Sequence, residues 1–156
     1  MSKLYLVRHG HYDHKDGCLT MAGVKQAITI GSTIGGFKTD VQYMIYTSPI
    51  LRAKVTADLI GQHVNKLNVI VTDLLREIET DESWGELKRR AMIAFRMAAI
   101  HVACDAIVVT HRAIIQAIMS EILVKDPNQI IILKGQVYQL STSGTILAQY
   151  EDRWGG

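Results

Sequence analysis

The sequence of 156 residues predicts an α/β fold, a three-layer sandwich in which helices cover both faces of a mainly parallel central sheet. Two observations predict this class. Short β-branched or aromatic runs alternate with longer stretches of helical periodicity along the chain. Two of the runs, Leu4–Val7 and Ala106–Thr110, are apolar almost throughout, which is typical of strands covered on both sides. Alternating strands and helices favour a parallel sheet with helices packed on its faces.

Strands are expected at four such runs and in a closing hairpin. The four runs are Leu4–Val7, Tyr43–Tyr46, Val69–Val71 and Ala106–Thr110. The hairpin is expected to pair Gln136–Leu140 with Thr145–Tyr150 through the turn Ser141–Gly144.

Four helices are expected between these strands because apolar residues recur there with helical spacing. The first follows a cap at Thr20, and the third is the longest, at about five turns. The fourth ends at Lys125-Asp126-Pro127. The apolar faces are, in chain order, Val24, Ala27, Ile28, Gly31 and Ile34; Leu51, Val55, Leu59 and Ile60; Leu87, Ala91, Ala94, Phe95, Ala98 and Val102; and Ile115, Ile118, Met119 and Ile122.

Length and composition indicate one ordinary globular domain over residues 1–156. The chain is 48% hydrophobic and 21% charged, and no repeat, linker or composition shift marks a boundary. A net charge of +2 is too small to indicate nucleic acid or a membrane surface as a partner. The one basic run, Lys88-Arg89-Arg90, lies in a helical pattern and is expected to form a solvated face.

The cysteines and the apolar runs indicate the cellular compartment in which the protein is expected. Cys18 and Cys104 have neither metal-type spacing nor the number needed for a disulfide framework. No apolar run approaches the ~18 residues of a membrane span, and Met1 leads directly into a strand without a signal region. We therefore expect a cytoplasmic protein in which Cys104 is a core residue.

Residues that can carry chemistry follow the expected strand ends. They are Arg8-His9-Gly10 after the first strand, Ser48 and Arg52 after the second, Asp73–Glu77 after the third and His111-Arg112 after the fourth. Ligands of such sheets bind beyond the carboxyl ends of the strands. Two histidines, a carboxylate and several arginines are thus expected to meet at one edge of the sheet.

This combination predicts a site for phosphoryl chemistry. The guanidinium fork of arginine matches phosphate oxygens, and each charge pair at 4 Å contributes about 4 kcal/mol at a dielectric constant of 20, before desolvation. A histidine such as His9 can attack phosphorus through a ring nitrogen. Glu77 is the candidate donor of the proton that the leaving oxygen needs. The neighbouring acids Glu79, Asp81, Glu82 and Glu86 also fit a solvated acidic loop.

The segment from His9 to His14 supports a competing interpretation. It spells H-x-H-x-D-H with His9, His11, Asp13 and His14, which resembles the zinc-ligand signature of the metallo-β-lactamase fold. That fold needs a larger sandwich of two sheets and further ligands downstream. The short chain and its strand–helix alternation therefore favour the phosphate site, with no metal and no other cofactor.

Five motifs in order resemble those of the histidine phosphatase superfamily, whose fold is phosphoglycerate mutase-like. They span residues 4–111, and each lies at an expected strand end or helix start. They are Leu6-Val7-Arg8-His9-Gly10, Leu19-Thr20-x-x-Gly23-x-x-Gln26-Ala27, Thr47-Ser48-Pro49-x-x-Arg52-Ala53-x-x-Thr56-Ala57, Leu75-Arg76-Glu77 and Val109-Thr110-His111.

The resemblance implies a phosphomonoester hydrolase that forms a phosphohistidine on His9. It implies a phosphate pocket of Arg8, Arg52 and His111, Glu77 as proton donor, and no metal or cofactor. The chain departs from the family where Arg112 follows His111 in place of a small residue, and where His11 and Tyr12 replace Glu or Gln and Thr or Ser. We regard His11, Tyr12 and Arg112 as the candidate substrate rim.

Substrate class and activity leave alternatives open. Only six residues separate Glu77 from the helix start near Trp84, which indicates an open pocket suited to a phosphoprotein or a bulky phosphoester. A phosphoglycerate mutase-type phosphotransferase needs to hold its product and fits such a pocket less well. A non-catalytic phosphate-binding module and a zinc metallohydrolase are the remaining alternatives. The oligomeric state is not indicated.

Overall fold

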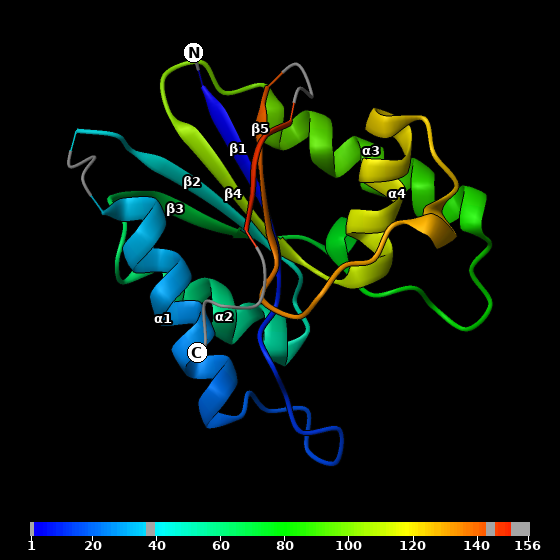
Figure 1. Ribbon diagram of the computed structural model, residues 1–156, viewed down its shortest axis with the longest axis horizontal. Coiled ribbons are helices and arrows are strands. Elements are labelled where there is room, and N and C mark those ends of the chain that lie inside the picture. Colours follow the sequence, from blue (N-terminus) through cyan, green and yellow to red (C-terminus); the bar gives the residue numbers. More distant parts are fainter. Residues whose placement is uncertain (1, 37–39, 143–145, 151–156) are drawn as a thin grey trace.

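The computed structural model describes residues 2–36, 40–142 and 146–150 and has a single six-stranded sheet in the order β3-β2-β4-β1-β5-β6 (Figure 1). The first four strands are mutually parallel, whereas β5 runs antiparallel to β1 and β6 antiparallel to β5. The strands are β1 (Lys3–Arg8), β2 (Tyr43–Thr47), β3 (Lys66–Val71), β4 (Asp105–Thr110), β5 (Val137–Ser141) and β6 (Ile146–Tyr150).

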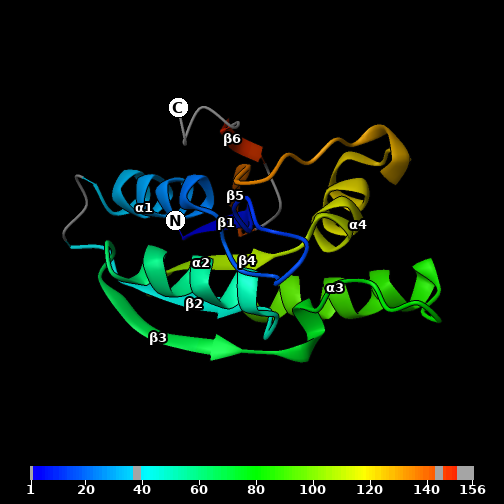
Figure 2. The same cartoon turned by 90° about the horizontal axis from the view of Figure 1, so that it is seen from below.

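Four helices cover the two faces of the sheet, which confirms the expected three-layer α/β class. They are α1 (Met21–Gly35), α2 (Leu51–Gly61), α3 (Trp84–Ala99) and α4 (Arg112–Leu123). Two short 3₁₀ turns, Asp73–Leu75 and Pro127–Gln129, were not expected from the sequence. The view in Figure 2 shows α1 on one side of the strands and α3 on the other.

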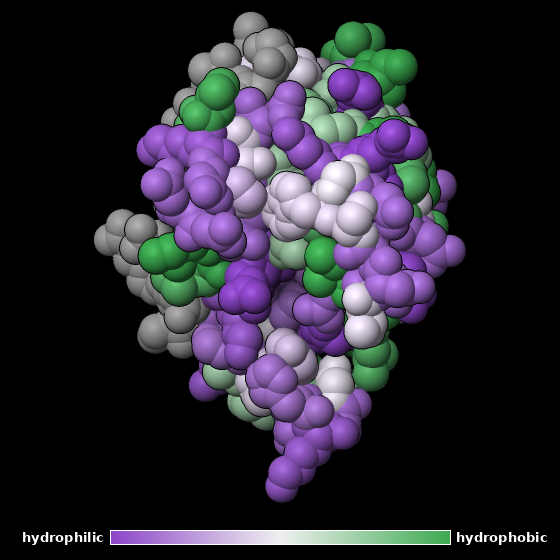
Figure 3. Space-filling model, turned by 90° about the vertical axis from the view of Figure 1, so that its right-hand side faces the viewer, coloured by the Kyte–Doolittle hydropathy of each residue, from purple (hydrophilic) through white to green (hydrophobic). Residues whose placement is uncertain are grey.

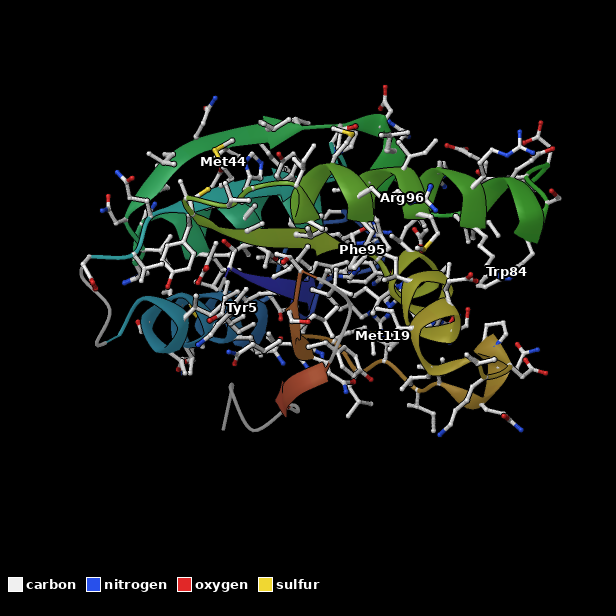
Figure 4. All side chains as sticks on the ribbon, turned by 90° about the horizontal axis from the view of Figure 1, so that it is seen from above. Tyr5, Met44, Trp84, Phe95, Arg96 and Met119 are labelled. Carbon is white, nitrogen blue, oxygen red and sulfur yellow. The ribbon has the colours of Figure 1, made fainter. Side chains whose placement is uncertain are left out.

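The core has two halves because alternate strand residues point to opposite faces. Leu4 and Leu6 of β1 pack with α3 and α4, whereas Tyr5 and Val7 pack with α1 and α2. Phe95 of α3 and Met119 of α4 belong to the same half of the core, and Figure 4 shows both well away from Tyr5, which lies on the side of α1. Burial of both faces of β1 and β4 explains their continuous apolar runs.

The buried face of α2 differs from the expected one. Leu51 is half exposed, and the buried residues are Ala53, Thr56, Ala57, Ile60 and Gly61. The reason is close packing against α1, since a Cβ on Gly31 would lie 2.9 Å from the Cα of Ile60. Small residues permit that approach, so a pattern of large apolar residues indicated the wrong face.

The third helix is shorter than expected at its carboxyl end. It stops at Ala99, and Val102 lies outside it with 92% of its surface exposed. Cys104 is buried, as expected, and Thr20 caps α1 by accepting the Gly23 N–H. The expected hairpin is present as β5 and β6, whereas Ser143, Gly144 and Thr145 lie outside the described residues. Within the described residues, no helix is long and apolar enough to cross a membrane.

The parallel pairing fixes where the candidate site lies. Arg8 at the end of β1 pairs with Thr110 at the end of β4, and Thr47 at the end of β2 pairs with Val109. The residues that follow these three strands therefore emerge at the same edge of the sheet. His9, Ser48 and His111 are those residues.

Candidate active site

His9 directly follows β1 and is 2% exposed. Its Nδ1 lies 2.9 Å from the carbonyl oxygen of Gly10, and its Nε2 lies 3.3 Å from Nε of Arg52. A carbonyl can only accept a hydrogen bond and a guanidinium can only donate one. The proton of the neutral ring is therefore on Nδ1, and the lone pair of Nε2 faces Arg52.

Electrostatics keep this ring uncharged. The pKa of His9 is lowered to about 3, mainly by burial and also by the nearby charges of Arg52, Arg8 and Lys134, and the hydrogen bond to Gly10 offsets part of this shift. An unprotonated ring nitrogen is the form that attacks phosphorus. Near neutral pH, His9 thus has the form of a nucleophile without needing a neighbouring base.

His111 occupies the position just before α4 and lies beside His9, with ring centres 5.2 Å apart. Its Nε2 is 2.8 Å from Oγ of Ser48, and Ser48 Oγ also accepts the backbone N–H of Ile50. Within the described residues, Nδ1 of His111 has no hydrogen-bond partner. Burial lowers the pKa of His111 to about 2, so the positive charge of this site comes from arginine and lysine.

Arg8 forms a hydrogen bond with the segment that leads to β5. Its Nη1 donates to the carbonyl oxygen of Ile132 at 2.6 Å, whereas its buried Nε has no partner within the described residues. Burial and the nearby charge of Arg112 lower the pKa of Arg8. A guanidinium that is desolvated and repelled by another cation is stabilised by an anion.

Arg52 connects the nucleophile to the candidate acid. Its Nε donates to His9, and its Nη2 forms an ion pair with Oε2 of Glu77. The guanidinium carbon also lies 4.5 Å from the ring centre of Tyr12, and the rings of Tyr12 and His9 are nearly perpendicular, with their centres 5.2 Å apart. The structure therefore brings together His9, Arg52, Glu77 and Tyr12, as the sequence predicts.

The loop that carries Glu77 is held by Arg90 of α3. Arg90 Nη1 donates to the carbonyl oxygens of Leu74 and Arg76, and Nη2 donates to that of Glu77. Nε and Nη2 of Arg90 also form a bidentate ion pair with Glu82, and this contact lowers the pKa of Glu82. The expectation that the whole basic run forms a solvated face is wrong at Arg90, because loop carbonyls and Glu82 satisfy its donors.

Lys134 is a site residue that the sequence did not indicate. Its ammonium lies 5.1 Å from the ring centre of Tyr12, and its charge lowers the pKa of His9. The next residue, Gly135, has a φ of +75° and donates its N–H toward the carbonyls of Arg8 and His9. The left-handed conformation of this glycine places the segment beside the end of β1. Lys134 lies far from every motif in the sequence, so nothing in the sequence indicated its place in the site.

The loop after His9 is fixed by two residues of the second motif. The side-chain oxygen of Gln26 accepts the backbone N–H of His11 at 2.9 Å. A Cβ on Gly23 would lie 2.1 Å from the carbonyl oxygen of His11, so only glycine allows this contact. The predicted rim residues His11 and Tyr12 thus lie beside the site in a rigidly held segment, and exposed Arg112 begins α4 next to His111.

The competing zinc pattern is not assembled. His9 is buried, whereas Asp13 and His14 are exposed, and Oδ1 of Asp13 accepts the backbone N–H of Lys15. Among the described residues, no three His, Cys, Asp or Glu side chains are grouped so that they could hold a metal ion. The spacing H-x-H-x-D-H therefore does not translate into a common ligand sphere here.

Comparison with known proteins gives one family and several similar structures. The model of the histidine phosphatase superfamily (branch 1) matches residues 4–82. No curated protein matches the sequence. A phosphoserine phosphatase of Entamoeba histolytica, solved with 3-phosphoglyceric acid, superposes with a TM-score of 0.76 at 17% identity over 100% of both chains. A mycobacterial glucosyl-3-phosphoglycerate phosphatase superposes with a TM-score of 0.71 at 18% identity over 90% of both chains. These similarities establish the phosphoglycerate mutase-like fold.

Proposed function

Because the chain belongs to the histidine phosphatase superfamily, we propose that it is a phosphomonoester hydrolase that works through a covalent phosphohistidine on His9. The observation that carries the proposal is the state of His9, a neutral buried ring with the Nε2 lone pair directed at Arg52. Hydrolysis of 4-nitrophenyl phosphate by the purified protein is the first test. Failure to release phosphate from this or any other monoester would contradict the proposal.

The proposed reaction has two steps. In the first, Nε2 of His9 attacks phosphorus, the bond from phosphorus to the ester oxygen breaks, and that oxygen takes a proton from the carboxyl group of Glu77. In the second, a water oxygen attacks phosphorus, the bond from phosphorus to Nε2 of His9 breaks with its electron pair returning to that nitrogen, and the water gives a proton back to Glu77. Inorganic phosphate leaves, and His9 returns to its neutral form.

Arg8, Arg52 and His111 are proposed to hold the phosphoryl group. The two arginines supply fixed positive charge and planar donors, which fit the three equatorial oxygens of the transition state. His111 is neutral and supplies a hydrogen-bonding ring held by Ser48. Arg52 has a second role, because its contacts with His9 and Glu77 align nucleophile and acid.

Among the alternatives, the hydrolase is best supported. The short connection from Glu77 to α3 leaves the site open toward a phosphoprotein or a bulky phosphoester, whereas a mutase must retain its product. A pure phosphate-binding module needs no unprotonated nucleophile, which argues against a non-catalytic role. The similar structures carry names of small-molecule phosphatases, so small phosphorylated compounds also belong in the substrate panel.

Chelation separates this mechanism from the metallohydrolase alternative. Since the proposed steps use only side chains, we expect less than twofold loss of activity in EDTA. The measurement is the rate of 4-nitrophenyl phosphate hydrolysis before and after chelation, with zinc added back. Loss of activity in EDTA and its recovery with zinc would revive the metal mechanism.

Two expectations from the sequence stay predictions. A cytoplasmic location is supported by two free cysteines, exposed Cys18 and buried Cys104, and fluorescence microscopy of a tagged protein would check it. A single domain over residues 1–156 is supported by the one continuous sheet, and one cooperative unfolding transition is the corresponding observation.

A further inference from the structure

A groove of about 480 Å³ adjoins the proposed phosphate pocket. It shares Arg8 with that pocket and continues between the start of α4 and the segment that leads to β5. Its lining residues are Arg8, Arg112, Gln116, Asn128 and residues 130–133. The volume lies in the range of small-molecule sites, roughly 300–1,000 Å³. Figure 3 views the molecule from the right-hand side of Figure 1 and shows that hydrophilic residues cover much of this face.

Two arginines give the lining of the groove a positive charge. Arg8 and Arg112 both line it, and none of its described lining residues is acidic. Arg112 is exposed, and within the described residues it forms no ion pair or hydrogen bond. Its charge and that of Arg8 repel each other, which contributes to the lowered pKa of Arg8. An anion between the two arginines would relieve this repulsion.

Arg112 does not serve the stability of the fold. It is the first residue of α4, where the helix dipole favours a negative side chain and disfavours a positive one. The charge of Arg112 therefore interacts unfavourably both with the helix dipole and with Arg8. A residue that stabilised this helix start would be acidic, so a binding role explains Arg112 better than a structural one.

The segment from Ile130 to Leu133 lines the groove and is held by two hydrogen bonds. Nε2 of Gln116 donates to the carbonyl oxygen of Ile130 at 2.8 Å, and Nη1 of Arg8 donates to that of Ile132. Ile130 and Ile132 are buried, whereas Ile131 and Leu133 are 75% and 42% exposed. This alternation leaves Ile131 and Leu133 as an apolar ledge in the groove lining. The groove thus combines two cations with an apolar ledge.

We propose that this groove is the subsite for the leaving group and that Arg112 selects phosphomonoesters whose leaving group carries a carboxylate. The phosphoryl group contacts Arg8, and a carboxylate a few bonds from the ester oxygen meets the fork of Arg112. The carbon atoms between them lie on the ledge. The proposal rests on the hydrolase function proposed above.

The test compares substrates that differ by one carboxylate. Phosphoserine and phosphoethanolamine differ only in that group, and their leaving oxygens are otherwise similar. A second pair of phosphoserine peptides carries Asp or Ala beside the phosphoserine. We expect kcat/KM to favour the carboxylate-bearing member of at least one pair about three- to tenfold, mainly through KM. A preference in the first pair identifies a small acid, and a preference in the second pair alone identifies an acidic peptide.

Arg112→Glu should abolish or invert that preference, measured as the ratio of kcat/KM within each pair, because any loss of phosphate affinity common to both members cancels in the ratio. The same variant should unfold at a higher temperature, because it places a favourable charge at the helix start. Arg96→Glu is the matched control, since it makes the same charge change at an exposed residue of α3 outside the groove (Figure 4). It should leave all ratios unchanged.

The outcomes are distinguishable. Turnover of all substrates without a carboxylate preference in either pair would overturn the subsite and leave the hydrolase standing. A preference that Arg112→Glu retains, or that Arg96→Glu removes equally, would also overturn it. A protein that hydrolyses none of the substrates, 4-nitrophenyl phosphate included, would overturn the subsite together with the proposed function.

Discussion

Replacing His9 by alanine is expected to reduce hydrolysis of 4-nitrophenyl phosphate by at least about 10⁴-fold. The reason is that Nε2 of His9 forms the covalent bond to phosphorus, and no other described side chain replaces it in that place. His111 lies close by, with the two ring centres 5.2 Å apart, but it is proposed to bind the phosphoryl group rather than to attack it. The measurement is the initial rate at saturating substrate, compared with the intact protein at equal concentration.

The folding of the His9→Ala variant must be measured together with its activity. His9 is buried, and its removal leaves the Gly10 carbonyl without a donor, which costs about 1–3 kcal/mol. His9→Asn retains an amide donor and serves as a second variant, and His63→Ala is the control at an exposed histidine. Substantial hydrolysis by a folded His9→Ala protein would rule out the nucleophile assigned here.

Glu77→Gln is expected to lower kcat/KM for an alkyl phosphate by about 10²-fold or more, and for 4-nitrophenyl phosphate by less than tenfold. An alkoxide needs a proton as it leaves, whereas a nitrophenolate does not. This parameter reports the steps up to the phosphohistidine, so a slower second step does not obscure the difference. Glutamine keeps the size of the side chain and its ability to accept from Arg52.

Glu79→Gln provides the matched control for that substitution. Glu79 lies in the same loop, and its carboxylate pairs with partly buried Arg76 rather than with Arg52. We expect both substrates to keep more than half of their kcat/KM in this variant. Equal losses on both substrates in Glu77→Gln would remove Glu77 from the role of acid and leave it a partner of Arg52.

Much of the site was predictable because it lies at strand ends. His9, Ser48 and His111 each follow a parallel strand, and parallel strands bring their carboxyl ends to one edge whatever the details of packing. Arg52 lies in the first turn of α2, just after the end of β2, and pairs with Glu77, which follows the end of β3. Local sequence and topology suffice for these residues.

The remaining features depend on contacts between distant segments. Lys134 reaches Tyr12 only because Gly135 takes a left-handed conformation against the end of β1. Arg90 supports the Glu77 loop through carbonyl oxygens, which no side-chain pattern encodes. The small residues on the buried face of α2 depend in the same way on how closely α1 approaches. Periodicity alone identifies a helix but does not reveal how closely its neighbours pack.

The most direct test of the account is to trap the phosphorylated protein and locate the phosphate. The protein is mixed with a labelled phosphomonoester, quenched within milliseconds in alkali and digested for mass spectrometry. We expect one phosphate per chain, stable in alkali, lost in acid and carried by the peptide that contains His9. Phosphate on another residue, or multiple turnovers with no phosphorylated protein at any time, would contradict a phosphohistidine mechanism at His9.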